Sequence, residues 1–184
     1  MLILASSSPR RRKLMSFLGV EFSVRSPQCD EYIENFQLPD SVMELARRKA
    51  LSVLKKGDVI VAADTIVECE GRILGKPSSD EEARAYLKFL SGRWHNVYTG
   101  VCVLSEEWEE TFYEKTRVKF RDLPKELIEF YISSRHHEDK AGAYGAQDTG
   151  SLFIERIEGD FMNVVGLPIG KTWETLYRRG VWKP

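Results

Sequence analysis

Hydrophobic residues follow two different periods along the chain, and their alternation predicts a mixed α/β fold. Nearly continuous apolar runs at residues 1–5 and 59–67, the second rich in valine and isoleucine, are typical of buried strands. Apolar positions three and four residues apart predict helices at residues 9–18, 42–54, 80–90, 123–133 and 172–178. Strand pairs are expected at residues 97–104 with 111–120 and at residues 152–157 with 161–165. Helices are thus interspersed with hairpins, which indicates a central sheet that is partly antiparallel and flanked by helices.

Polar residues beside the apolar runs indicate where two helices begin. Ser8 is a good N-cap and Pro9 a good first helical residue, since that position needs no N–H donor. Ser41 and Glu44 have the spacing of a capping box, in which each side chain accepts a hydrogen bond from the backbone N–H of the other residue. We therefore expect the second helix to begin near residue 42.

The length of the chain bounds its organisation. With 184 residues and no internal repeat, low-complexity segment or long linker, the sequence predicts a single domain at residues 1–184. No stretch approaches the roughly 18 apolar residues that a membrane helix needs. Residues 1–5 are apolar and the chain then becomes polar and basic, which is the reverse of the order in a secretory signal. We therefore expect a cytoplasmic protein without a membrane partner.

Charge and cysteine content exclude several classes of protein. Lys and Arg total 27 and Asp and Glu total 28, so the net charge is −1, which argues against nucleic acid as a partner. The 3 cysteines are far apart and form no Cys-x-x-Cys pair, which argues against a disulfide framework. The 3 histidines include no His-Glu-x-x-His motif, so a zinc site of that kind is not expected.

Four consecutive cations, residues 10–13, stand at the expected beginning of the first helix with no acid beside them. A helix N-terminus favours anions, so each cation there costs about 0.3–1 kcal/mol. A bound polyphosphate would remove the conflict, because it would accept hydrogen bonds from serine hydroxyls, free helical N–H groups and arginine side chains. The alternative is a solvated basic helix end whose charges neighbouring acids balance.

Asp64 interrupts the apolar run at residues 59–67. A carboxylate inside a buried strand is costly unless it is paired or bound to a metal. The alternative is that Asp64 lies at a strand end that faces water. Considered alone, Glu31 is typical of an acid in a loop. Lys49 is typical of a solvated lysine on a helix, and Lys76 is typical of a surface lysine.

Segments in chain order from residue 5 to residue 168 resemble the Maf family, the septum-formation-type nucleoside triphosphate pyrophosphatases. These segments are Ala5-Ser-Ser-Ser-Pro-Arg-Arg-Arg-Lys-Leu14, Ala63-Asp64-Thr65, Leu74-Gly-Lys-Pro77, Ser91-Gly92 with Tyr98-Thr-Gly-Val101, Asp139-Lys-Ala-Gly-Ala-Tyr-Gly145, and Ile157-Glu-Gly-Asp160 with Asn163-Val-Val-Gly-Leu-Pro168.

The resemblance implies a fold similar to that of inosine triphosphatases, with two lobes and a cleft. It implies hydrolysis of a nucleoside triphosphate to the monophosphate and pyrophosphate with a divalent cation, Mg²⁺ or Mn²⁺. One branch of the family acts on dTTP and UTP and another on a methylated GTP, and the Ala-Asp-Thr triplet with the 141–147 loop resembles the first. The family also suggests a homodimer and a role in septum formation. Two alternatives stay open: the same reaction on a modified purine nucleotide, or a division regulator that binds nucleotide or nucleic acid without turnover.

The resemblance also implies roles for individual residues. By position, Asp64 matches the catalytic proton acceptor of the family. Positions tied to substrate choice match Arg10, Thr65 and Gln147. Other polar residues of the cleft match Ser6, Arg11, Glu31, Lys49 and Lys76. Oxygen ligands such as the carboxylates of Glu31 and Asp64 suit Mg²⁺ or Mn²⁺, and whether Asp64 is base or metal ligand stays open.

The chain departs from the family pattern after Gln147. The loop usually continues with Gly, whereas here Asp148 and Thr149 follow. An added acid near the expected base pocket bears on which base is preferred and leaves the reaction type unchanged.

Overall fold

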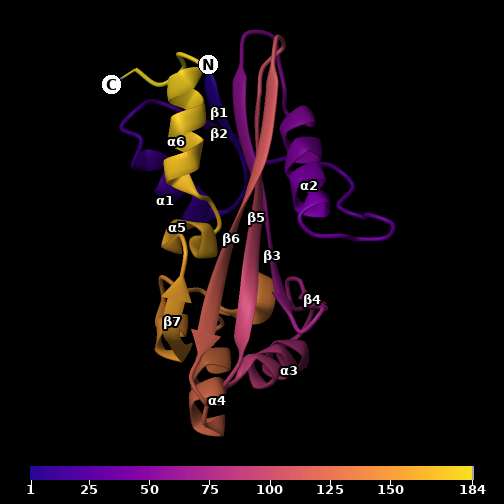
Figure 1. Cartoon of the computed structure of the whole chain (residues 1–184), viewed down its shortest axis with the longest axis vertical. Coiled ribbons are helices and arrows are strands. Elements are labelled where there is room, and N and C mark those ends of the chain that lie inside the picture. Colours follow the sequence, from indigo (N-terminus) through magenta and orange to yellow (C-terminus); the bar gives the residue numbers. More distant parts are fainter. Residues whose placement is uncertain (184) are drawn as a thin grey trace. The chain divides into compact units, whose positions relative to one another are not determined.

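The structure is a computed structural model that describes residues 1–183. The strands are β1 (Leu2–Ala5), β2 (Ser23–Arg25), β3 (Val59–Cys69), β4 (Arg72–Leu74), β5 (Trp94–Leu104), β6 (Glu109–Phe120) and β7 (Ile154–Glu158). The helices are α1 (Pro9–Ser16), α2 (Asp40–Leu51), α3 (Asp80–Leu90), α4 (Lys125–Ser133), α5 (Phe161–Val165) and α6 (Ile169–Arg178), together with the 3₁₀ turns η1 (Ala141–Ala143) and η2 (Thr149–Phe153). Figure 1 labels the helices and strands along the chain.

The described strands form one seven-stranded sheet in the order β2-β1-β3-β5-β6-β7, with β4 paired to β3. Strand β1 runs parallel to β2 and to β3, whereas the β3–β4 and β6–β7 pairs are antiparallel. This mixed sheet, with its helices, confirms the predicted fold class. Because parallel neighbours need long connections, β1 and β3 are joined through α1, β2 and α2.

Contacts divide the chain into two compact units. Unit 1 contains residues 1–65, 99–114 and 166 onward, and unit 2 contains residues 66–98 and 115–165. Strands β3, β5 and β6 contribute residues to both units. The single domain at residues 1–184 stays a prediction. No helix within residues 1–183 is long and apolar enough to cross a bilayer.

The core of unit 1 lies between α2 and the sheet. It is formed by small and branched apolar side chains of β1, α2, β3 and β5: Ile3, Ala5, Ala46, Ala50, Val53, Ile60, Ala62, Cys102 and Leu104. Close packing of α2 on β5 requires a glycine, because a Cβ at Gly100 would lie 2.3 Å from the backbone carbon of Val42. This contact fixes α2, which carries Lys49, against the strands that carry Asp64 and Thr99.

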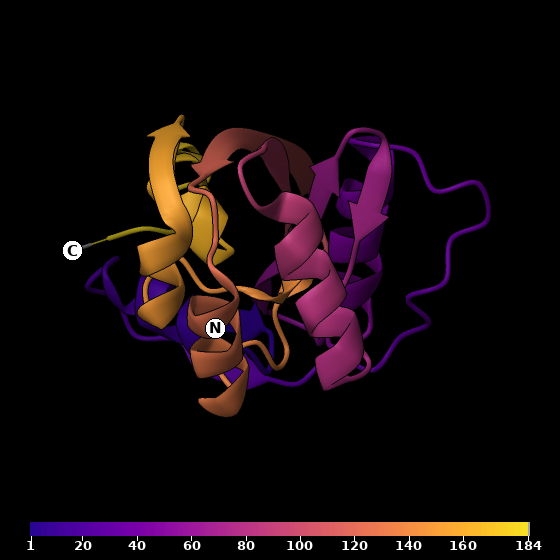
Figure 2. The same cartoon turned by 90° about the horizontal axis from the view of Figure 1, so that it is seen from below.

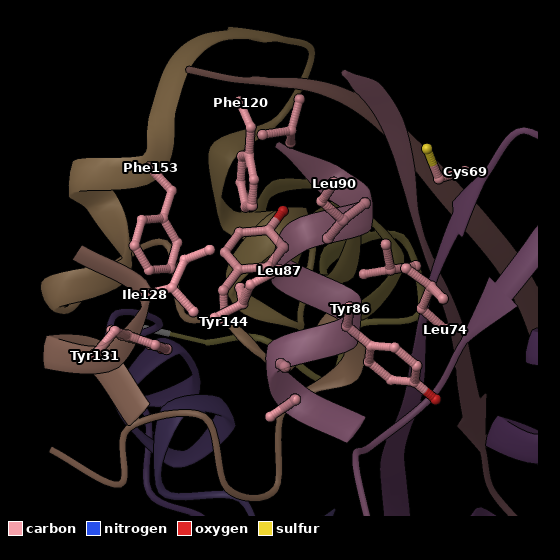
Figure 3. Close-up of a cluster of buried hydrophobic side chains, with 14 of the residues drawn as sticks. Cys69, Leu74, Tyr86, Leu87, Leu90, Phe120, Ile128, Tyr131, Tyr144 and Phe153 are labelled. Atoms are coloured by element: carbon pink, nitrogen blue, oxygen red, sulfur yellow. The ribbon is translucent and has the colours of Figure 1, made fainter. Parts of the chain in front are cut away.

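The core of unit 2 is larger and more aromatic. Figure 3 shows Phe120, Tyr131, Tyr144 and Phe153 gathered beside Leu87 and Leu90 of α3. Helices α3 and α4 contact each other and lie side by side in Figure 2. Aromatic pairs such as Phe120 with Tyr144 meet edge to face at a centroid distance of 4.7 Å, which is the arrangement that ring quadrupoles favour.

Two local predictions were wrong. Ser41 is not the cap of α2, because its hydroxyl accepts from the backbone N–H of Gln37 at 2.7 Å and the helix begins at Asp40. Residues 161–165 form α5 and not a strand, and the partner of β7 is β6. The turn is supported by Asp160, whose carboxylate accepts from the N–H of Met162 at 2.7 Å, and by the buried side chain of Asn163. By contrast, Ser8 caps α1 and Pro9 begins it, as predicted.

Candidate active site

The central feature of unit 1 is a buried ion pair between Asp64 of β3 and Lys49 of α2. The ammonium nitrogen of Lys49 lies 2.5 Å from Oδ1 of Asp64, and the two side chains are 8% and 12% exposed. Asp64 therefore does not face water at a strand end. A buried ion pair adds little to stability compared with apolar residues of similar volume, so stability alone does not explain its position.

Glu31 adds a second carboxylate to the same ammonium group. Its Oε1 lies 3.0 Å from Nζ of Lys49, and its own side chain is 56% exposed. Glu31 belongs to the long loop between β2 and α2, which Figure 2 shows as the purple excursion of the chain. A buried lysine is thus shared by one buried and one exposed carboxylate.

Arg48 holds the backbone on either side of Glu31. Its Nη1 donates to the carbonyl oxygens of Tyr32 at 2.8 Å and Asp30 at 3.4 Å, while its Nε donates to Glu44 at 3.0 Å. Two adjacent residues of α2 therefore bind the same loop: Arg48 binds carbonyl groups of the loop backbone, and Lys49 binds the side chain of Glu31.

Arg11 connects the beginning of α1 to Thr65 and to the segment before α6. Its Nε donates to the carbonyl oxygen of Gly166 at 2.7 Å and its Nη2 donates to Oγ1 of Thr65 at 2.9 Å. Burial lowers the pKa of the Arg11 guanidinium, and the nearby Asp64 carboxylate opposes that shift. The hydroxyl of Thr65 also lies 2.9 Å from that of the buried Thr99 on β5. Thr65 is therefore held from two sides.

The four cations at the beginning of α1 have different environments. Arg10 and Arg11 are partly buried, whereas Arg12 and Lys13 are exposed. The first turn of α1 contains no acidic residue, so the charge conflict expected from the sequence is present. Ser6 is buried, and its hydroxyl accepts from the N–H of Ser8 at 3.1 Å.

Seven of the nine predicted site residues lie in unit 1, and the structure brings five of them into two bonded groups. Lys49 contacts Asp64 and Glu31, and Arg11 contacts Thr65. The remaining members of unit 1 are Ser6 and Arg10.

Lys76 and Gln147 lie in unit 2, and both are exposed. Their segments are bonded to each other, because the N–H of Gly142 donates to the carbonyl oxygen of Gly75 at 3.1 Å. Gly142 has a φ of +68° and packs against Val67, a position that suits glycine.

Asp148 directs its carboxylate into its own loop. Its Oδ1 accepts from the N–H of Gly150 at 2.9 Å, and its Oδ2 lies 3.4 Å from Nζ of Lys140. The hydroxyl of Tyr131 donates to the same carboxylate at 3.4 Å and accepts from the N–H of Gly145 at 3.0 Å. The added acid therefore serves to shape the loop that carries Gln147.

The carboxylates of Asp64 and Glu31 fit the chemistry of a hard divalent cation. Both supply oxygen ligands, and one or two carboxylates are the usual protein contribution where Mg²⁺ also contacts substrate phosphates. Both carboxylates already share one cation, the ammonium of Lys49. Within residues 1–183, no group of three or more His, Cys, Asp or Glu side chains is arranged to hold a metal ion.

Sequence reasoning missed two residues that position the site, Arg48 and Thr99. Arg48 is one of several surface-type charges on α2, and nothing in its spacing indicates that it binds a distant loop. Thr99 belongs to a segment that supports the family resemblance, but the sequence does not show that its hydroxyl meets Thr65 across 34 positions.

The chain is similar along nearly its whole length to proteins of one family. The model of the family described as Maf-like protein matches residues 1–179. A protein of Thermotoga maritima named dTTP/UTP pyrophosphatase is 49% identical over 99% of this chain and 91% of its own length. Proteins with the same name from Thermosipho melanesiensis and Bacillus cereus are each 46% identical, over 98% and 92% of this chain and 98% and 91% of their own lengths.

A solved structure supports the fold. The Ham1 protein of Staphylococcus aureus matches with a TM-score of 0.55 over 97% of this chain and 98% of its own, at 13% identity. At that identity the likeness concerns the fold alone.

Proposed function

This chain belongs to the Maf-like protein family, and we propose that it hydrolyses dTTP and UTP to the corresponding monophosphate and pyrophosphate. The names of relatives at 46–49% identity support this substrate class. The observation that carries the proposal is the buried Asp64 carboxylate held by Lys49 in unit 1. Arg11 of α1 and Thr65 of β3 lie in the same unit and are bonded to each other, so cationic and hydroxyl groups accompany the acid.

In the proposed reaction one phosphoanhydride bond breaks, and one new bond forms between the α-phosphorus and the oxygen of water. Water attacks the α-phosphorus, the bond to the bridging α–β oxygen breaks, and pyrophosphate leaves. Asp64 takes the proton of the attacking water. Its Oδ1 is bound to Lys49, while its Oδ2 makes no hydrogen bond within residues 1–183 and is the oxygen suited to that role.

The cationic residues stabilise the charge that develops on the leaving pyrophosphate. Such positioning and electrostatic stabilisation supply most of the catalysis in phosphoryl transfer. We assign this role to Arg10, Arg11 and Lys49, with Ser6 as a hydrogen-bonding group for phosphate. A bound Mg²⁺ or Mn²⁺, held by Asp64 and Glu31, would supply Lewis-acid neutralisation of phosphate oxygens.

Base selection is the second part of the proposal. The hydroxyl of Thr65 and the amide of Gln147 have the donors and acceptors that a pyrimidine edge needs. Lys76, an exposed lysine, adds a phosphate contact. The assignments of Lys76 and Gln147 rest on the family motif.

The cellular setting belongs to the same proposal. We assign the chain to a homodimer and to septum formation, because the family resemblance suggests both, and to the cytoplasm, the location expected in the sequence analysis. Sedimentation at several protein concentrations tests the homodimer directly.

A nucleotide panel tests the substrate class. Equal concentrations of dTTP, UTP, CTP, dATP, GTP and methylated GTP are incubated with Mg²⁺ or Mn²⁺, and products are identified by phosphorus NMR. We expect pyrophosphate and monophosphate from dTTP and UTP. A strong preference for purine nucleotides would overturn the pyrimidine assignment. Stepwise release of orthophosphate, in place of pyrophosphate, would overturn the proposed reaction. Tight binding of nucleotide or DNA without turnover would favour a regulator.

A further inference from the structure

We propose that Lys49 occupies the metal position in the nucleotide-free protein and gives it up when a triphosphate arrives. The inference deepens the proposed function, on which it rests, because it concerns how the same site is filled. A divalent cation would then bind with the nucleotide and not before it.

The ammonium group of Lys49 contacts both carboxylates of the site. Nζ of Lys49 lies 2.5 Å from Asp64 and 3.0 Å from Glu31. It therefore stands between the two carboxylates, where a cation that bridged them would lie. An ammonium and a divalent metal compete for this place, because both need the negative charge of the same oxygens.

The residues that share this ion pair differ in burial. The Lys49 and Asp64 side chains are almost fully buried, whereas that of Glu31 is 56% exposed. Leaving Asp64 without a cation would be costly in this environment. Lys49 therefore stays bound to the carboxylates until another cation replaces it or a new anion binds its ammonium group. A triphosphate supplies such an anion, because its oxygens can bind the ammonium in place of the carboxylates.

The loop that carries Glu31 is anchored to α2 independently of Lys49. Arg48 binds the backbone carbonyls of Asp30 and Tyr32, so the loop stays against α2 even when Lys49 changes partners. Lys49 itself is a flexible four-carbon side chain with a compact charge, which allows its nitrogen to move while its backbone stays in α2. The carboxylates can thus remain in place while their cation is exchanged.

The test measures Mn²⁺ binding without any nucleotide, by electron paramagnetic resonance of free Mn²⁺. The wild-type protein should bind Mn²⁺ with a Kd weaker than about 1 mM, like low-affinity oxygen sites. Lys49→Met should bind it about tenfold or more tightly, because the competing positive charge is gone. Lys49→Arg, which keeps the charge, should bind as weakly as the wild type.

Two controls make the gain specific. Lys88→Met removes an exposed lysine of α3 in unit 2 and should leave Mn²⁺ binding unchanged. Adding Asp64→Asn to Lys49→Met should remove the gained affinity, because one of the two carboxylates is lost. A thermal unfolding scan gives a second readout: Mn²⁺ should raise the Tm of Lys49→Met and leave that of the wild type unchanged.

The outcomes separate this inference from the proposed function. Equal Mn²⁺ affinity of folded Lys49→Met and wild-type protein would overturn the inference, and so would tight Mn²⁺ binding by the nucleotide-free wild type. The wild-type titration needs no variant, so the inference stays testable if Lys49→Met does not fold. Because no nucleotide is present, none of these results depends on hydrolysis, which the nucleotide panel tests by itself.

Discussion

Asp64 of β3 and His95 of β5 are both buried polar residues on central strands, but their environments differ in kind. Asp64, in unit 1, is paired with Lys49 and has an oxygen without a hydrogen bond within residues 1–183. His95, in unit 2, is 2% exposed, binds the hydroxyl of Tyr144 at 2.8 Å and packs edge to face on Phe120. Burial lowers the pKa of His95 to about 3, so it is neutral at physiological pH.

The difference shows how buried polar groups can serve two purposes. In unit 2 His95 is neutral and packs against the rings of Phe120 and Tyr144, so it specifies packing. In unit 1 charged groups are held beside an exposed loop, so they remain able to exchange partners. We therefore expect changes near Asp64 to affect turnover and changes near His95 to affect stability.

The largest expected effect is on turnover by Asp64→Asn. The substitution keeps the shape of the side chain but removes the base, so kcat should fall by about 10²–10⁴-fold with little change in Tm. Steady-state hydrolysis of dTTP and a thermal scan measure both. Glu68→Gln, on the same strand, is the matched control and should keep its activity. A fully active Asp64→Asn protein would remove Asp64 from the mechanism.

Asn163→Ala should reverse this pattern. The buried amide of Asn163 donates to the carbonyl oxygen of Val97 at 3.1 Å and to the hydroxyl of Thr116 at 3.0 Å. Leaving these groups without that donor should lower the free energy of unfolding by about 3 kcal/mol. Urea unfolding measures the loss, and kcat per folded molecule should stay within about threefold of the wild type. A loss of turnover with normal stability would contradict the division between the units.

The titration of His95 gives a pH-dependent stability effect. Its pKa is lowered in the folded state, so its contribution is complete above about pH 6.5 and is lost as the pH falls toward 3. In that window, wild-type stability should fall by up to about 1.4 kcal/mol per pH unit more steeply than that of His95→Gln. Urea unfolding at pH 7, 6, 5 and 4 compares the slopes. Equal slopes for His95→Gln and the wild type would contradict the assignment.

The smallest expected effect is that of Arg48→Met. The loop around Glu31 should loosen, so the Mg²⁺ concentration for half-maximal activity should rise by about tenfold. At saturating Mg²⁺ the kcat should stay close to that of the wild type, because Arg48 acts through Glu31. Arg47→Met, which removes the neighbouring ion pair with Glu109, is the control. An equal change in both variants would indicate a general effect on α2.

Much of the fold could be predicted from local patterns. The buried strand β3, the cap at Ser8 and the amphipathic helices follow from periodicity and from residues next to them in sequence. Strand β2 could not be predicted in this way, because three residues carry too little pattern and their pairing with β1 is set by tertiary contacts. The helix at residues 161–165 was mistaken for a strand because the buried bonds of Asn163 are not visible in a short apolar run.

The candidate site was predictable in part. Asp64 and the cations of α1 violate local rules, so the sequence alone indicates them. The partner of Asp64 could not be found from spacing, because Lys49 has the pattern of an ordinary helix lysine and meets the acid only when α2 packs on the sheet. Arg48 and Thr99 act through backbone and hydroxyl contacts that leave no sequence pattern. The family resemblance supplied Glu31, Lys76 and Gln147.

The role of Asp64 is tested most directly by a single-turnover hydrolysis of dTTP in water enriched in oxygen-18. Mass spectrometry then determines where the label enters. If Asp64 directs water to the α-phosphorus, the wild type should place one labelled oxygen in the monophosphate and none in pyrophosphate, and Asp64→Asn should form almost no product. Label in pyrophosphate or orthophosphate would rule out attack at the α-phosphorus, and normal turnover by Asp64→Asn would rule out Asp64 as the base.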